Sequence, residues 1–275
     1  MADHPRGGWI TPAEACEYLR TGTGRGVRIA VLDSGIETGH PALSGLRFIE
    51  DIAIVKEGQE LRTAPGEGRD VFGHGTAVAG IIGRVAPEAE IGSIRVLGER
   101  LDSRTAIIAE GAYQAIERGY DILNCSFGCA VPEHVLQYKK WVDLAYIRGI
   151  HVVAACNNLD HTRPEWPGYF SSVVTVNMLP ADQDALLVHV PDTLVEFAAP
   201  GFGVHVPWQN NQFREVSGSS FAAPVAAGLL ARLLSVSGNL HPPVAQAILR
   251  QIAPIHEITL SATDPNWRWP RRSPR

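Results

Sequence analysis

The chain has 275 residues, of which 45% are hydrophobic, and a formal net charge of -5 at pH 7. This length supports one sizeable core and is too short for two ordinary domains with linkers. Mild acidity with both signs of charge interspersed argues against a nucleic-acid partner. Because no apolar run approaches the roughly 20 residues that span a bilayer, we also expect no membrane insertion.

The N-terminus and the cysteines bear on the cellular compartment. The first residues, MADHPRGGWITP, lack the charged and then apolar pattern of a secretory signal. The cysteines Cys16, Cys125, Cys129 and Cys156 are expected to be small buried hydrophobes. Metal ligation is disfavoured, since the Cys125–Cys129 spacing has no matching second Cys or His pair. We therefore predict a cytoplasmic protein.

Short β-branched runs alternate with helical patterns along the chain. Strands are predicted at Val27–Leu32, Ile91–Leu97, Asp121–Cys125, Ile150–Ala155, Ser172–Val176 and Leu194–Ala198. Helices are predicted at Thr76–Val85, Arg104–Arg118, Pro132–Arg148, Phe221–Ser235 and Pro243–Ile252. The alternation predicts a single-domain α/β fold, with a mostly parallel twisted sheet and helices on both faces. Ligands in such folds bind at the carboxyl ends of the strands.

The domain boundaries follow from this pattern. We expect one domain over residues 27–260, preceded by a short N-terminal segment, residues 1–26, that packs on or near it. Residues 261–275 are rich in Arg and Pro and are predicted to form a flexible tail, with partner docking as the alternative.

Two polar residues flanked by glycine stand out in the first third of the chain. Asp33 directly follows the first strand, where a buried carboxylate is costly unless it is paired. It could instead cap a turn with the help of Gly35. His74 lies between Gly73 and Gly75 at the start of a small-residue helix. The two glycines keep bulky side chains away from the imidazole, an arrangement that suits a general base.

A third candidate precedes an apolar helix near the C-terminus, in the segment Val216–Pro224. A serine at a helix N-terminus is close to free backbone N–H groups that stabilise negative charge, which suits a nucleophile. An ordinary helix N-cap would explain either Ser219 or Ser220 equally well.

The order Asp, His, Ser, each with its own glycine signature, resembles the subtilisin-like (subtilase) serine protease family from about Trp9 to Ile252. The segments that carry the resemblance are Leu32–Gly35 with His40-Pro41, Gly73–Thr76 with Val78–Gly80, and Gly218–Pro224. Ser219 stands where the family usually has Thr, and Phe221 where it usually has Met. The resemblance implies a serine endopeptidase that acts on polypeptides through an acyl-enzyme and needs no cofactor. It makes Ser220 the nucleophile, His74 its base, and Asp33 the residue that orients the imidazole.

The family also uses an asparagine after a buried strand to bind the oxyanion. Matching that strand places Asn158 in the donor position, with Asn157 where Gly is usual. Asn tolerates left-handed backbone angles better than most residues, so this exchange is plausible. The backbone N–H of Ser220 is the expected second donor.

The resemblance further implies which segments bind substrate. Ser126, Phe127 and Gly128 match the strand end that pairs with the substrate backbone and forms one wall of the primary specificity pocket, and Leu97 and Gly98 begin the opposing rim. If Glu165 lines the floor of that pocket, a basic residue at the cleavage position is favoured. The alternative, which we favour from the sequence, is that Glu165 points into solvent. Cys129 and Cys156 should lie near the pocket and could make activity sensitive to oxidants.

The chain departs from the family's calcium site. Many relatives take ligands from an Asp shortly after the aspartate motif and from a loop after the histidine helix. Ala42 stands at the first position, and Ile81–Arg84 run directly into Val85-Ala86-Pro87, which leaves no room for that loop. We therefore expect no metal at this site.

Two other functions are compatible with the motifs. The chain could be a catalytically silent peptide-binding scaffold, or an esterase that uses the same triad. Covalent labelling by a fluorophosphonate separates the scaffold from the enzymes, and parallel casein and ester assays separate the two enzymes.

Overall fold

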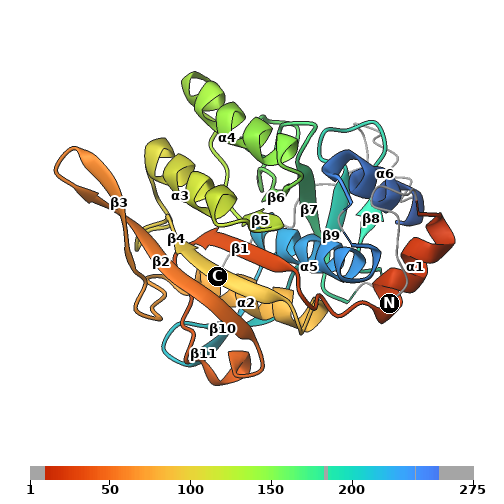
Figure 1. Cartoon of the computed structure of the whole chain (residues 1–275), viewed down its shortest axis with the longest axis horizontal. Helices are drawn as coiled ribbons and strands as arrows, with labels where there is room; N and C mark the ends of the chain where they lie inside the picture. The colour runs from red at the N-terminus through yellow and green to blue at the C-terminus, as the bar shows by residue number, and fades with distance from the viewer. Residues whose placement is uncertain (1–9, 183–184, 239, 254–275) are drawn as a thin grey trace, which may run out of the picture.

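A nine-stranded sheet forms the centre of the molecule, in the order β3-β2-β4-β1-β5-β6-β7-β9-β8 (Figure 1). The structure is a computed structural model that describes residues 10–182, 185–238 and 240–253. The strands are β1 (Arg28–Asp33), β2 (Arg47–Glu57), β3 (Glu60–Pro65), β4 (Glu90–Arg95), β5 (Ile122–Cys125), β6 (His151–Ala155), β7 (Val174–Pro180), β8 (Val188–His189) and β9 (Phe197–Phe202). A separate hairpin consists of β10 (Val204–Trp208) and β11 (Gln212–Val216).

The inner strands from β2 to β9 pair in parallel, while β3 and β8 are antiparallel at the two edges. The helices are α1 (Pro12–Thr21), α2 (His74–Val85), α3 (Thr105–Glu117), α4 (Val135–Ile147), α5 (Ser219–Ser237) and α6 (Pro242–Ile252). Two short 3-10 helices are η1 (Pro41–Leu43) and η2 (Pro132–His134). The predicted α/β class, with a mostly parallel sheet, is confirmed.

Each face of the sheet has its own hydrophobic core because successive strand residues point to opposite faces. In β1, Ile29 and Val31 pack with α2 and α5, whereas Ala30 and Leu32 pack with α3 and α4. Figure 1 shows α3 and α4 on the upper side of the sheet and α2 and α5 on the other. Burial on both faces explains why β1 is a nearly continuous apolar run.

The N-terminal helix α1 was not predicted. Its start nevertheless has a capping box, in which the side chains and backbone N–H groups of Thr11 and Glu14 bond reciprocally. The helix packs against α5 and α6, and the Arg232 guanidinium of α5 donates to the carbonyl of Leu19 at 2.5 Å. The part of the predicted segment 1–26 that the structure describes therefore lies on the main body. Residues 1–9, and the predicted tail at 261–275, lie outside the described residues.

Two helices begin two residues earlier than the sequence indicates. The helix α2 starts at His74 and α5 at Ser219, so both candidate reacting residues lie in a first helical turn. The predicted helix over 132–148 is divided into η2 and α4. Strands β2, β3, β10 and β11 were not predicted, because none is a continuous apolar run: β2, β3 and β11 carry charged residues, and β10 is interrupted by His205 and Pro207.

Among the described residues, α5 is the single helix that is long and apolar enough to cross a membrane by length and composition. It is 78% buried inside the fold, as expected of the core helix of a globular protein. Its residues from Ala222 to Leu234 pack against α1, α2 and the strands β5 to β9.

Candidate active site

Three polar side chains far apart in the sequence meet where strand β1 ends and helices α2 and α5 begin. The Nδ1 atom of His74 lies 2.8 and 2.9 Å from the two carboxylate oxygens of Asp33. On the other side of the ring, Nε2 lies 2.9 Å from the Ser220 hydroxyl. Asp33, His74 and Ser220 thus form one continuous hydrogen-bonded chain. Asp33 is fully buried, His74 is buried, and Ser220 is partly exposed.

The parallel sheet explains why these residues meet. Asp33 is the last residue of β1, beside Arg95 at the end of β4, and β5 ends next to it at Cys125. The ends of parallel strands lie at one edge, where polar side chains reach helix N-termini without crossing the core. The segment after β4 stays at this edge, since the N–H groups of Val96 and Leu97 donate to the Asp33 carbonyl at 2.9 and 3.1 Å.

Two glycines beside His74 are required by close approaches. A Cβ at Gly75 would lie 2.1 Å from the Gly35 carbonyl oxygen, so no larger residue fits. Gly73 has a φ of 111°, and a Cβ there would lie 2.4 Å from the Trp208 indole nitrogen. These contacts let the first turn of α2 approach the end of β1 closely enough for the imidazole to reach Asp33.

A second carboxylate, Asp70, supports the triad and was not identified from the sequence. It is buried and accepts hydrogen bonds from the backbone N–H groups of Phe72, Gly73 and Thr76 at 3.0, 2.6 and 2.8 Å. It also accepts from the hydroxyls of Ser34 at 2.7 Å and Thr76 at 2.6 Å. Asp70 therefore satisfies N–H groups at the start of α2 that have no intrahelical partner. The sequence pattern that could have identified it is an Asp four residues before His74, close to the predicted start of a helix, where Asp often caps backbone N–H groups.

The electrostatic environment favours the charged form of His74. Burial opposes protonation of the imidazole, but the carboxylate of Asp33, through its charge and its hydrogen bond, and the charge of Asp70 outweigh burial and raise the pKa of His74. The imidazolium that forms when a base accepts a proton is therefore stabilised here.

The structure distinguishes Ser219 from Ser220. The Ser219 hydroxyl is buried and donates to the Cys156 carbonyl at 2.7 Å, whereas the Ser220 hydroxyl faces His74. Phe221 packs on the imidazole, with ring centroids 4.9 Å apart and planes at 50°. The bulky side chain thus covers one side of His74 and leaves the hydrogen bond to Ser220 intact.

The two asparagines after β6 have different partners. The Asn158 side-chain oxygen accepts from the Ser219 N–H at 2.8 Å, which leaves its amide N–H groups free to donate at the exposed surface. The Asn157 oxygen accepts from the N–H groups of Leu159 and Asp160, both at 2.8 Å, and its amide donates to Glu165. Asn157 is not among the described residues with positive φ, so tolerance of left-handed angles does not explain why Asn stands there.

The predicted substrate-binding residues occupy neighbouring surfaces. Leu97, Phe127 and Gly128 line one cavity of about 680 Å³ beside the N-terminus of α3. Gly98 lines an adjacent hollow that shares Leu97 with it. Ser126 is buried and accepts a hydrogen bond from the Asn124 amide at 2.8 Å. The segments after β4 and β5 therefore form two sides of an open cavity.

The expectation that Glu165 points into solvent is wrong. Glu165 is half-buried, and its Oε1 accepts from the Asn157 amide at 2.7 Å. A Cβ at Gly128 would lie 2.5 Å from Glu165 Oε2, so the carboxylate lies against that glycine. The antiparallel backbone bridge between Cys129 and Trp166 holds the two segments together and sets this position.

The oxidant hypothesis needs revision for Cys156, because this thiol is buried and burial raises its pKa to about 12. The expectation that all four cysteines are buried is wrong for Cys16, which is exposed, and for Cys129, which is partly exposed. We expect iodoacetamide near neutral pH to modify these two, while Cys125 and Cys156 are protected. Mass mapping before and after denaturation measures this, with the denatured sample as the control. Rapid native alkylation of Cys156 would contradict the burial.

No group of three or more His, Cys, Asp or Glu side chains that could hold a metal ion occurs within the described residues. Ala42 lies in η1, where its N–H donates to His40. The absence of a calcium site near this position stays a prediction from the sequence.

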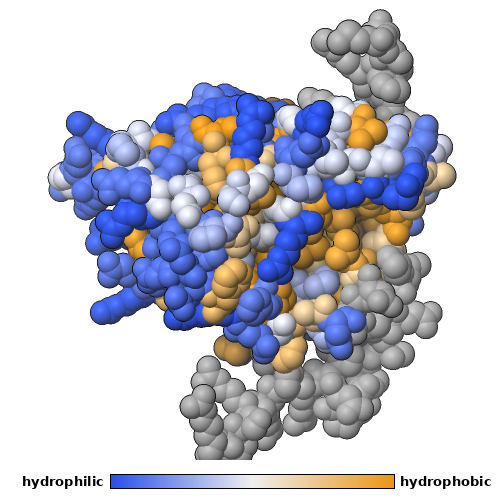
Figure 2. All heavy atoms as spheres, turned by 90° about the horizontal axis from the view of Figure 1, so that it is seen from below, coloured by the Kyte–Doolittle hydropathy of each residue, from blue (hydrophilic) through white to orange (hydrophobic). Residues whose placement is uncertain are grey.

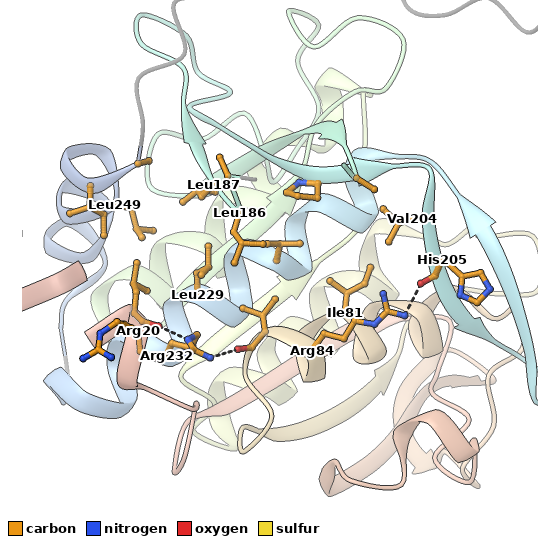
Figure 3. Close-up of a pocket in the computed structure, with 18 residues that line it drawn as sticks. Arg20, Ile81, Arg84, Leu186, Leu187, Val204, His205, Leu229, Arg232 and Leu249 are labelled. Atoms are coloured by element: carbon orange, nitrogen blue, oxygen red, sulfur yellow. Dashed lines mark hydrogen bonds between the residues drawn. The ribbon is translucent and has the colours of Figure 1, made fainter. Parts of the chain in front are cut away.

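A cavity of about 820 Å³ lies apart from this site and is lined by none of Asp33, His74 and Ser220. It opens among α1, α2, α5, α6 and the strands β9 and β10, and Figure 3 shows its apolar floor, which includes Leu229 and Leu249. The face drawn in Figure 2 is largely hydrophilic, with hydrophobic atoms gathered toward its right-hand side. Arginines at the cavity rim donate to carbonyls, as Arg84 does to His205 and Arg232 to Val85. This cavity has no nucleophile and base in contact, unlike the end of β1.

The comparisons with known proteins agree with this geometry. Residues 24–266 match the model of the subtilase family. The chain is 29% identical to thermitase of Thermoactinomyces vulgaris over 82% of its own length and 80% of that protein's. It is 33% identical to an intracellular serine protease of Paenibacillus polymyxa, over 76% of this chain and 66% of that protein.

Solved structures give the same fold. A cold-adapted subtilisin-like serine proteinase superposes with a TM-score of 0.70 at 24% identity, covering 84% of this chain and 83% of that one. A psychrophilic protease superposes with a TM-score of 0.69 at 26% identity, covering 83% of both chains. The chain therefore belongs to the subtilase family of serine proteases.

Proposed function

We propose that the chain is an endopeptidase in which Asp33, His74 and Ser220 act as the catalytic triad. The observation that carries the proposal is the continuous hydrogen-bonded chain from the Asp33 carboxylate through the imidazole to the Ser220 hydroxyl. A serine hydroxyl is a weak nucleophile until a base in contact accepts its proton. His74 is the group in such contact.

In the first half of the reaction, the Ser220 oxygen attacks the scissile carbonyl while His74 Nε2 takes its proton. His74 then donates this proton to the leaving amine, which departs and leaves an acyl-enzyme on Ser220. In the second half a water molecule, deprotonated by His74, attacks the ester and releases the acid. Asp33 keeps a proton on Nδ1 so that Nε2 is free to accept, and it stabilises the imidazolium.

Asn158 is proposed as the side-chain donor to the oxyanion that forms on the carbonyl. Its oxygen accepts from the Ser219 N–H, which leaves the amide N–H groups available to donate to an oxyanion. The backbone N–H of Ser220 is the second proposed donor, at a helix N-terminus where partial positive charge favours an anion. The bonds of Asn157 within the loop and to Glu165 support Asn158 over Asn157 for this role.

We infer that Asp70 is a positioning residue whose charge helps to set the pH profile. Because Asp70 raises the pKa of His74, Asp70→Asn is expected to lower that pKa and move the acidic limb of kcat/KM to lower pH. The variant should also unfold more easily, by about 1–3 kcal/mol, because one of the two acceptor oxygens becomes an NH₂ group that faces buried donors. A pH–rate profile and a thermal melt measure the two effects.

Glu67→Gln is the matched control for Asp70. It removes an exposed acidic side chain three residues away, whose charge is screened by solvent, so the profile should not move. A lower melting temperature in Asp70→Asn with an unchanged acidic limb would make Asp70 a purely structural cap.

We also propose that the protein acts in the cytoplasm. All four cysteines are free, which suits a reducing compartment, and one of the relatives is named an intracellular protease. The proposed substrate is a polypeptide that binds in extended form against the segments after β4 and β5.

The function is tested by reacting the protein with a fluorophosphonate and mapping the modified residue. An active triad gives a stable adduct on Ser220, and casein is then cleaved faster than a short-chain ester at matched enzyme concentration. No adduct would support a silent peptide-binding scaffold. An adduct with ester hydrolysis and no proteolysis would support an esterase.

A further inference from the structure

An acidic side chain lies between the two segments that flank the space beside the proposed oxyanion site. Glu165 contacts Gly128 on one side, in the segment after β5, and Asn157 on the other, in the segment after β6. Asn157 directly precedes Asn158, whose oxygen is bonded to the N–H next to Ser220. Glu165 is therefore connected to Asn158, the proposed oxyanion donor, through its hydrogen bond to the neighbouring Asn157. Asn158 is in turn bonded to the residue before Ser220.

The carboxylate is held in a defined orientation. Both backbone hydrogen bonds between Cys129 and Trp166, at 2.9 and 3.0 Å, join the strand-like segments next to Gly128 and Glu165. The Tyr169 N–H donates to the Glu165 carbonyl at 2.8 Å, which closes a turn after it. The Asn157 oxygen is occupied by two backbone N–H groups, so its NH₂ faces Glu165 and fixes Oε1. Only Oε2 is left to face a ligand.

Within the described residues, no lysine or arginine forms an ion pair with Glu165. Arg163, two residues away, pairs with Asp160 at 3.4 Å. Burial raises the pKa of Glu165, and the single hydrogen bond from Asn157 opposes this shift. A half-buried carboxylate without a cation is costly, and a cation brought by a ligand would lower that cost.

A basic side chain on the substrate residue that carries the reacting carbonyl would supply such a cation. The residue on the N-terminal side of the scissile bond carries the reacting carbonyl, so its side chain starts next to Ser220 and Asn158. Gly128 and Asn157, which precedes Asn158, both contact Glu165. A long side chain on this residue that turns toward these two segments would therefore approach the Glu165 carboxylate.

We propose that Glu165 makes the enzyme selective for lysine or arginine immediately before the scissile bond. This inference rests on the proposed function, because it takes Ser220 and Asn158 as the groups that hold the reacting carbonyl. Glu165 thus acts as a specificity-determining residue that contacts the substrate side chain by charge.

The test uses fluorogenic peptides that are identical except for Arg, Lys, Gln, Leu or Ala before the cleaved bond. The wild type should turn over the Arg and Lys peptides best. In Glu165→Gln, kcat/KM for these two should fall about 10- to 100-fold, as expected when a partly buried charge pair at close range is lost. The Gln, Leu and Ala peptides should change little, since the amide oxygen that this substitution introduces can still accept from Asn157. Raising the salt concentration should weaken the wild type's preference for basic residues.

Glu60→Gln is the matched control, since it removes an exposed carboxylate in the β3 hairpin and leaves the total charge the same as in the test variant. It should keep the wild-type preference. Glu165→Asp, which retains the charge, should keep part of the preference and shows whether charge or shape is responsible. Should either variant at this position fail to fold, the wild-type preference and its salt dependence decide the matter.

Several results would overturn the inference. Equal rates or a preference for Leu in the wild type would show that Glu165 does not select a cation. Fastest cleavage after Ala would show that Glu165 fills the pocket and excludes large side chains. An equal loss for all five peptides in Glu165→Gln would indicate a structural role.

A fluorophosphonate carries no amino-acid side chain that could contact Glu165, so its reaction with Ser220 tests the proposed function independently of the specificity. Wild type that is labelled and cleaves peptides, but without a basic preference, rejects the specificity alone. Wild type that is neither labelled nor cleaves any peptide rejects the function, and the specificity with it.

Discussion

Ser220→Ala is expected to reduce peptide hydrolysis by about 10⁶-fold in kcat, the size of loss known when a subtilisin loses its nucleophile. The physical reason is that, among the residues the structure describes, Ser220 supplies the hydroxyl that contacts His74 Nε2, at 2.9 Å. His74→Ala should cause a similar loss because the remaining hydroxyl has no base. The double variant should be no slower than either single one, since the two groups act as one unit.

Asp33→Ala should cost less than either of these changes, roughly 10⁴-fold, because the serine and histidine remain in contact. Ser217→Ala is the matched control. Ser217 lies three residues before the nucleophile, is exposed, and accepts a hydrogen bond from the Gly203 N–H. Its hydroxyl takes no part in the proposed reaction, so kcat should change little. The measurement is active-site-titrated peptide hydrolysis, with circular dichroism to verify folding. Activity of Ser220→Ala within tenfold of wild type would exclude Ser220 as the nucleophile.

Asn158→Leu is expected to lower kcat by about 10²–10³-fold with little change in KM, as in a subtilisin that loses its oxyanion asparagine. The interaction forms with the charged oxygen of the transition state and hardly with the neutral carbonyl, so its loss appears in kcat. The variant also leaves the Ser219 N–H without its acceptor, which should lower stability by about 1–3 kcal/mol. Steady-state kinetics well below the melting temperature separate the two effects.

Asn157→Ala provides the comparison that identifies the donor. It breaks hydrogen bonds that close the loop and orient Glu165, each worth about 1 kcal/mol, without removing an oxyanion donor. With a Leu peptide we expect less than about a tenfold loss in kcat, far below that of Asn158→Leu. A larger loss for Asn157→Ala than for Asn158→Leu would reverse the assignment of the two asparagines.

Much of the fold could be predicted because the inner strands are buried on both faces. Strands such as β1 and β6 are nearly continuous short apolar runs, as expected of strands that are buried on both faces. The edge strands and the β10–β11 hairpin escaped prediction for the opposite reason. In β11 four of the five residues are exposed, so its extended form depends on pairing with β10 and not on its own apolar pattern.

The sequence by itself was enough to predict Asp33, His74 and Ser220 as a triad in that order, because a glycine lies close to each of them and the three motifs together resemble the subtilase family. Gly75 shows why: any side chain there would collide with the Gly35 carbonyl. Such steric demands restrict the residues next to a reacting side chain, as Gly75 is next to His74, and are therefore visible in a short motif.

Only the tertiary structure supplies the contacts of residues whose partners lie far away in the chain. The hydrogen bond that supports Asn158 as the proposed donor comes from Ser219, more than 60 positions later, and Asp70 is bonded to Ser34 and to the start of α2. Glu165 is the clearest case. From the sequence it resembles a solvated loop residue, and only the bridge between Cys129 and Trp166 places its carboxylate against Gly128. Contacts of this kind arise when separate strand ends are brought to one edge of the sheet, and no local pattern encodes them.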